Sequence, residues 1–165
     1  MKKIKLLSIA ALLGILLIAQ TSQAVPFSDT VEFGGTPGSI EITDSYSYTH
    51  TLTGLNSTSY ILNDATLTLR HNGNSNNTTG ELWYTYGDSS PDILIGQLYA
   101  SSGSMWVEQV FTLGADILSL MSGTDPWSLT VLLNETTNGT DKLKIDWSTL
   151  SGNYGLLPKS IFLLL

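Results

Sequence analysis

The 165-residue chain has no cysteine, which excludes disulfide bonds, a thiolate zinc site and a cysteine nucleophile. Histidine is almost as scarce, since His50 and His71 are the two present and they do not form the His-x-x-x-His pair of many zinc sites. No serine lies in a Gly-x-Ser-x-Gly turn, the setting of the nucleophile in α/β-hydrolases. We therefore expect neither metal-hydrolase nor serine-hydrolase chemistry, and we predict that the protein is not an enzyme.

Basic side chains are also few. Seven lysines and arginines stand against 14 aspartates and glutamates, which gives a net charge of −7. Binding to a phosphate backbone depends on basic side chains that displace counterions, and an acidic chain repels such a backbone. The composition therefore argues against a nucleic acid partner.

The first 24 residues have the pattern of a secretory signal peptide. Three lysines among the first five residues precede a run of apolar and small residues from 6 to 19, and Ser22-Gln23-Ala24 has the small side chains of a cleavage site. The apolar run is shorter than the ~20 residues of a membrane-spanning helix, so we predict cleavage after Ala24 rather than a retained anchor. The mature chain keeps four basic and all 14 acidic side chains, a net charge of −10. These features predict a bacterial protein that is secreted or held at the cell surface, with no stable membrane span in its mature chain.

Short runs of alternating apolar and polar residues fill the remainder of the chain. Residues 45–52, 65–69 and 81–86 are examples, and turn-forming glycine, asparagine, serine or proline residues separate such runs. A two-residue period is typical of a strand with one buried face, and only residues 114–121 have the spacing of a short helix. This pattern predicts an all-β fold, an antiparallel β-sandwich that is jelly-roll-like, with one short helical turn. We divide the chain into a signal peptide (1–24), one β-sandwich domain (25–155) and a short apolar tail (156–165).

The alternation also predicts which side chains share a face. His50 is in phase with the two tyrosines before it, so we expect it to be packed at the edge of the core. His71 begins a polar segment and is expected to be solvated. Leu143, Ile145 and Trp147 are in phase and are expected to project to one face.

Several strand segments share a pattern with a known class of proteins. The pattern opens with Tyr-x-His-x-Leu in residues 46–52 and Ala-x-Leu-x-Leu in residues 61–69. Later strand segments continue it in residues 110–113, 127–131 and 143–147. This pattern resembles that of secreted bacterial β-sandwich domains of the PEP-CTERM sorting-signal (choice-of-anchor-like) class. The resemblance implies a location at the cell surface or in the exopolysaccharide matrix, and most members have no assigned activity. The tail departs from the class, because residues 161–165 are too few to span a membrane and lack a basic end, so we expect an atypical or truncated tail.

Aromatic side chains are the candidates for a ligand-binding surface. Trp83 and Trp106 lie within or beside predicted strands, and an exposed indole ring offers a flat apolar surface on which a sugar ring can stack. The alternative for Trp83 is a place beneath a loop. Loop aspartates such as Asp44 and Asp141 could contribute to a structural calcium ion, but no Asp-x-Asp-x-Asp-Gly loop is present and no metal site is assigned.

The favoured function is a structural or adhesive role for an exported protein at the cell surface or in the extracellular matrix, with exopolysaccharide or other surface proteins as partners and no cofactor. The alternative is a carbohydrate-binding module that stacks sugars on exposed aromatic rings, with calcium as an optional structural ion. A third class, a glycan-cleaving enzyme, would need two carboxylates such as Glu81 and Glu108 to face one cleft.

Overall fold

The computed structural model describes residues 23–34, 38–72, 83–87, 91–99, 105–135 and 142–157. Within these ranges the chain forms nine strands and one helix. They are β1 (Val25–Glu32), β2 (Ile40–Ile42), β3 (Ser45–Leu52), β4 (Tyr60–Asn72), β5 (Trp83–Gly87), β6 (Ile93–Gln97), β7 (Val107–Thr112), α2 (Ala115–Ser122), β8 (Trp127–Glu135) and β9 (Leu143–Leu156). The helix confirms the prediction over 114–121. Among the described residues it is the one helix, and its eight residues are too few to cross a membrane.

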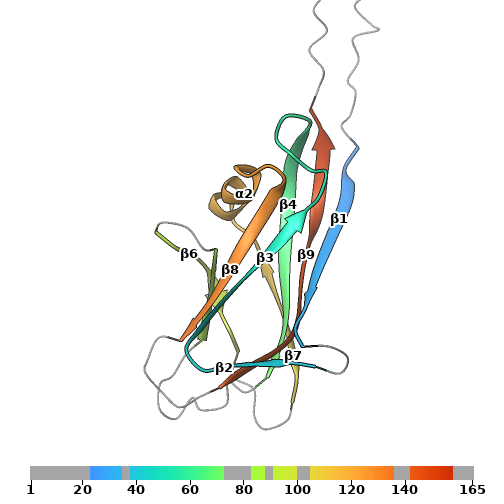
Figure 1. Cartoon of the computed structure of the whole chain (residues 1–165). Coiled ribbons are helices and arrows are strands. Elements are labelled where there is room, and N and C mark those ends of the chain that lie inside the picture. The colour runs from blue at the N-terminus through green and yellow to red at the C-terminus, as the bar shows by residue number, and fades with distance from the viewer. Residues whose placement is uncertain are drawn as a thin grey trace, which may run out of the picture.

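The strands form two antiparallel sheets that pack face to face (Figure 1). The five-stranded sheet has the order β1-β9-β4-β7, and β2 pairs with the first residues of β9, beyond the stretch that β1 covers. The four-stranded sheet has the order β3-β8-β5-β6. Because the chain passes repeatedly from one sheet to the other, the predicted jelly-roll-like sandwich is confirmed.

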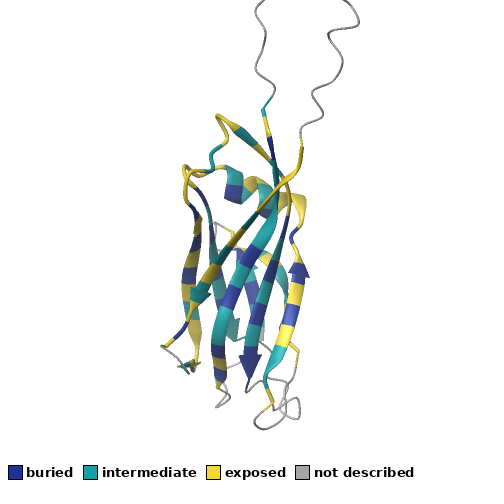
Figure 2. Ribbon diagram, turned by 90° about the vertical axis from the view of Figure 1, so that its right-hand side faces the viewer, coloured by how far each residue is buried: buried dark blue, intermediate teal, exposed yellow. Residues whose placement is uncertain are grey.

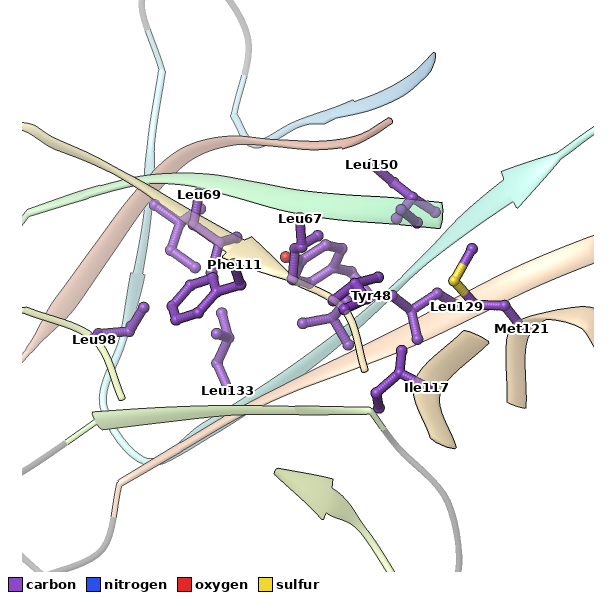
Figure 3. Close-up of a cluster of buried hydrophobic side chains, with 14 of the residues drawn as sticks. Tyr48, Leu67, Leu69, Leu98, Phe111, Ile117, Met121, Leu129, Leu133 and Leu150 are labelled. Atoms are coloured by element: carbon purple, nitrogen blue, oxygen red, sulfur yellow. The ribbon is translucent and has the colours of Figure 1, made fainter. Parts of the chain in front are cut away.

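Side chains from the inner faces of both sheets form one core. Buried and exposed bands alternate along the strands in Figure 2, as the two-residue period predicts. Figure 3 shows Leu67 and Leu69 of β4 beside Phe111 of β7, with Leu133 of β8 opposite them. Ile117 and Met121 of α2 are buried in the same core, so the helix covers one part of the space between the sheets.

Three strands are longer than the sequence pattern predicts. β1 includes residues 25–29, which are not among the alternating runs of the sequence, because backbone pairing with β9 from Val25 to Glu32 does not require an alternating pattern. β4 is continuous through a bulge at Asn63. Beside this bulge, a Cβ atom on Gly152 of β9 would collide with the Asp64 carbonyl oxygen. β9 continues to Leu156, nine residues beyond the predicted end.

Candidate functional site

A second β-bulge determines which side chains of β9 reach each face of the five-stranded sheet. His71 of β4 pairs with Ile145 and Arg70 pairs with Trp147, so Asp146 is an extra residue in β9. The fully buried, inward residues therefore change from odd to even numbers at the bulge: Leu143 and Ile145 lie before it, and Ser148 and Leu150 lie after it.

Trp147 lies on the outer face of the sheet, contrary to the expectation that it shares a face with Leu143 and Ile145. It pairs with Arg70 on one side and with Glu32 of β1 on the other. Directly paired residues of antiparallel strands project to the same face, and Glu32 is exposed while the Arg70 side chain is 37% exposed. The expectation was wrong because the added residue at the bulge shifts the alternation by one.

Arg70 links this outer surface to Trp106. Its guanidinium carbon lies 5.5 Å from the centroid of the Trp106 ring, within the range of a cation–π contact. Its Nη1 atom donates a hydrogen bond of 2.9 Å to Oδ2 of Asp146. Glu108 is exposed and pairs with Arg70 across β4 and β7. We call these residues the tryptophan site: Arg70, Trp106, Glu108, Asp146 and Trp147.

The tryptophan site combines two aromatic rings with fixed polar groups. Indole rings supply a large, rigid contact area, and a guanidinium group with two carboxylates supplies directed hydrogen-bond donors and acceptors. The Arg70–Asp146 pair is partly exposed, so water screens it and its contribution to stability is small. Aromatic surface with a few directed polar groups is suited to a ligand that has both apolar faces and hydroxyl groups.

On the inner side of the bulge, Ser148 belongs to a hydrogen-bonded chain of polar side chains that ends at the partly exposed Asp29. The Tyr48 hydroxyl donates to Ser148 Oγ, Ser148 Oγ contacts His50 Nε2, and His50 Nδ1 contacts Asp29 Oδ2, each over 2.9 Å. A carboxylate can only accept, so Nδ1 carries the His50 proton and Ser148 donates to Nε2. Since Asp29 lies on β1, Ser148 on β9 and His50 on β3, this chain connects the two sheets.

The hydrogen-bonded side chains of Ser148, His50 and Asp29 follow one another in the order of a Ser-His-Asp triad, but the serine is enclosed. Ser148 and His50 are both 0% exposed. A groove of about 400 Å³ borders Asp29, and neither of the other two residues lines it. A catalytic serine must reach a substrate carbonyl beside an oxyanion hole, so we interpret this chain as a structural link between the sheets. The expectation that His50 is packed is confirmed.

Burial is the main influence on the protonation of His50 and Tyr48 in this hydrogen-bonded chain. It lowers the pKa of His50, and the hydrogen bond and charge of Asp29 oppose that shift. Burial also raises the pKa of Tyr48, against the smaller effect of its hydrogen bond to Ser148. Both side chains therefore favour their neutral forms, which the tautomer assigned above requires.

His71 is buried as well, so the expectation that it is solvated was wrong. It lies inside β4, which continues one residue further, and it is 0% exposed. Neither ring nitrogen has a hydrogen-bond partner within the described residues. The nearby Gln109 amide instead donates to the Gln97 carbonyl and accepts from the Tyr99 N–H, both over 2.8 Å. Burial lowers the pKa of His71.

The other predicted site residues do not form a cluster. Trp83 opens β5, but its side chain lies outside the described residues, as do Glu81 and Asp141. Asp44 is exposed between β2 and β3. In the described part of the chain, no group of three or more histidine, aspartate or glutamate side chains is arranged to hold a metal ion. Ala24 is exposed and immediately precedes β1, and cleavage after it stays a prediction.

Comparison with known proteins gives distant similarities of fold. No family model and no curated protein sequence matches this chain. Dimeric latent PorU from Porphyromonas gingivalis has a TM-score of 0.47 and 9% identity, and the alignment covers 83% of this chain and 14% of PorU.

Two other similar structures are single domains of larger proteins. A carbohydrate-binding domain (CBM36-1) of a multidomain xylanase, from the hindgut metagenome of Trinervitermes trinervoides, has a TM-score of 0.41, 16% identity and coverage of 76% and 96%. An adhesin domain of Lys-gingipain from Porphyromonas gingivalis has a TM-score of 0.36, 12% identity and coverage of 78% and 93%. The similar structures thus include a carbohydrate-binding domain and an adhesin domain.

Proposed function

We propose that this chain is an exported, non-catalytic binding domain that attaches to a polysaccharide through the tryptophan site. The observation that carries the proposal is that Arg70, on the outer sheet face, contacts the Trp106 ring and pairs with Trp147 across β4 and β9. A sugar ring has apolar faces that stack on indole and hydroxyl groups that bond to a guanidinium or carboxylate. Of the functions predicted from the sequence, the carbohydrate-binding module is therefore favoured over a purely structural role.

The charge of the chain favours a neutral polysaccharide. The predicted mature chain has four basic and 14 acidic side chains, and Arg70 is already paired with Asp146. Glu32 and Glu108 lie on either side of Arg70 and Trp147, so an anionic sugar would meet like charge. Uronate-rich chains should bind more weakly than neutral ones.

Affinity electrophoresis tests the proposal. The purified protein is run through gels that contain cellulose derivatives, xylan, mannan or starch as neutral probes and alginate as the anionic probe. We expect retardation by at least one neutral polysaccharide and none by alginate. Trp106→Ala and Trp147→Ala should each weaken binding by about tenfold or more, whereas Tyr99→Ala, which removes an aromatic ring that is 65% exposed elsewhere, should not.

Three results would contradict the proposal. They are retardation by none of the neutral polysaccharides, equal binding by the wild type and both tryptophan variants, and release of reducing sugar from the retained polysaccharide. The first would return the chain to a purely structural or protein-binding role.

A further inference from the structure

The outer face of the four-stranded sheet carries a second aromatic pair. Thr85 and Gly87 of β5 are buried, so the alternation turns Tyr84 and Tyr86 outward. Their ring centroids are 6.3 Å apart and the rings are tilted by 39° to one another. Both residues are only partly buried, so the two rings form a continuous aromatic surface along the strand.

The neighbours of this pair extend the surface across three strands. Tyr86 pairs with Leu132 of β8 and with Leu94 of β6, and Leu94 is 56% exposed. Tyr84 pairs with Asn134 of β8 and Gln97 of β6. We call these residues the tyrosine face: Tyr84, Tyr86, Leu94, Gln97, Leu132 and Asn134. Leu94, Tyr86 and Leu132 form an apolar row across the three strands, and Gln97 and Asn134 place their amide groups on either side of Tyr84 in the next row.

The tyrosine face differs from the tryptophan site in charge. The strands β3, β5, β6 and β8 contain no aspartate, lysine or arginine, although the chain has 21 charged residues in all. Their one carboxylate is Glu135, at the end of β8, and its Oε1 atom is buried. An anionic ligand would find no lysine or arginine on these four strands, whereas a neutral ligand rich in hydroxyl groups can use the amides without displacing an ion pair.

We propose that the tyrosine face is a second binding surface for a neutral polysaccharide, so that one domain binds two chains and cross-links them. The proposal rests on the proposed function of the tryptophan site. The two surfaces lie on opposite outer faces of a sandwich, each on a different sheet, so a single extended chain cannot lie along both. Two surfaces on one rigid body convert weak single contacts into a bridge between polymers.

Calorimetric titration with cellohexaose, xylohexaose, mannohexaose and maltohexaose separates the two surfaces. The wild-type protein should bind two molecules of at least one hexasaccharide. The double variant Tyr84→Thr/Tyr86→Thr, which replaces the rings by residues that also favour strands, should bind one. The double variant Trp106→Ala/Trp147→Ala should also bind one, and the combination of all four substitutions should bind none.

A conservative variant and a bridging assay complete the design. Tyr84→Phe/Tyr86→Phe keeps both rings and should retain two sites within about a threefold change in affinity, because stacking needs the ring. Beads coated with the retained polysaccharide should aggregate with the wild type and with neither of the double variants that lose one face. Circular dichroism and the unfolding midpoint check that each variant is folded.

The outcomes distinguish this inference from the proposed function. One site in the wild type, unchanged by the threonine substitutions, overturns the second surface and leaves the tryptophan site in place. One site that survives the tryptophan substitutions but not the threonine substitutions overturns the tryptophan site instead. Concentration-dependent dimerisation that the threonine substitutions abolish would show that a second copy of the chain covers this face. Binding of no hexasaccharide would overturn both.

Discussion

The interior of the sandwich differs on the two sides of the bulge at Asp146. On one side, Ser148 faces inward and gives both His50 and Tyr48 a hydrogen-bond partner. On the other side, Ile145 faces inward and pairs with His71, whose two ring nitrogens have no partner in the described chain. Both histidines are fully buried. Burial therefore does not decide what a core histidine contributes to stability; the partner that the neighbouring strand places beside it does.

The largest expected effect comes from removing the bulge. Deleting Asp146 should either turn Ser148 outward or turn Trp147 inward, and it should lower the free energy of unfolding by about 4 kcal/mol or more. Asp146→Asn keeps the extra residue and should change that free energy by less than about 1 kcal/mol. Urea unfolding followed by tryptophan fluorescence measures both. A deletion variant as stable as the asparagine variant would show that the bulge does not set the two faces.

Ser148→Ala should have the next largest effect. The substitution leaves the Tyr48 hydroxyl and His50 Nε2 buried without a partner, which should cost about 2–4 kcal/mol of unfolding free energy. Ser151→Ala, on the outer face of the same strand, removes a partly buried contact to Thr66 and should cost less than about 1 kcal/mol. Equal losses in the same urea experiment would contradict the account of the polar chain.

The two histidines should respond in opposite directions to the same substitution. His71→Phe removes two unpartnered nitrogens and should raise the free energy of unfolding by about 1 kcal/mol. His50→Phe removes a partnered ring and should lower it. Thermal unfolding of the two variants side by side tests the difference, and a loss of similar size in both would show that His71 has a partner after all.

The smallest expected effect is a dependence on pH. Burial lowers the pKa of both histidines in the folded state, so the unfolded chain binds more protons at mildly acidic pH. The free energy of unfolding should therefore decrease as the pH falls below about 6.5, the ordinary pKa of histidine. His71→Phe should make this decrease shallower, as measured by urea midpoints from about pH 7.5 to about pH 5. A free energy of unfolding that increases as the pH falls over this interval would contradict the lowered pKa of the two histidines.

The sequence predicts the sandwich well because alternation directly records which face of a strand is buried. It places Leu67 and Leu69 in phase in the core, locates the helix within one residue, and identifies His50 as a packed residue. It does not predict the bulge at Asp146, because an extra residue in one strand is defined by its pairing with another strand. The positions of Trp147 and Ser148 follow from that pairing and were therefore not predictable.

The candidate site is harder to predict for the same reason. Trp106 is a candidate because of its residue type, but the Arg70 side chain that contacts its ring is bonded to Asp146, which lies 76 residues from Arg70 in the sequence. The polar chain joins His50 to Ser148 over 98 residues and to Asp29 over 21. Asp29 lies in a segment whose pattern does not resemble a strand. The sequence offers a local signal for Trp147, which ends an alternating run and follows Asp146.

The most direct test of the central claim follows the tryptophan indole N–H signals by NMR during titration with a neutral polysaccharide fragment. Trp127 is an internal control, because it is 0% exposed and its indole N–H donates to Ser57 Oγ. Binding at the tryptophan site predicts that the signals of Trp106 and Trp147 shift together while that of Trp127 stays unchanged. A fragment that binds without moving either of those two signals would contradict the account.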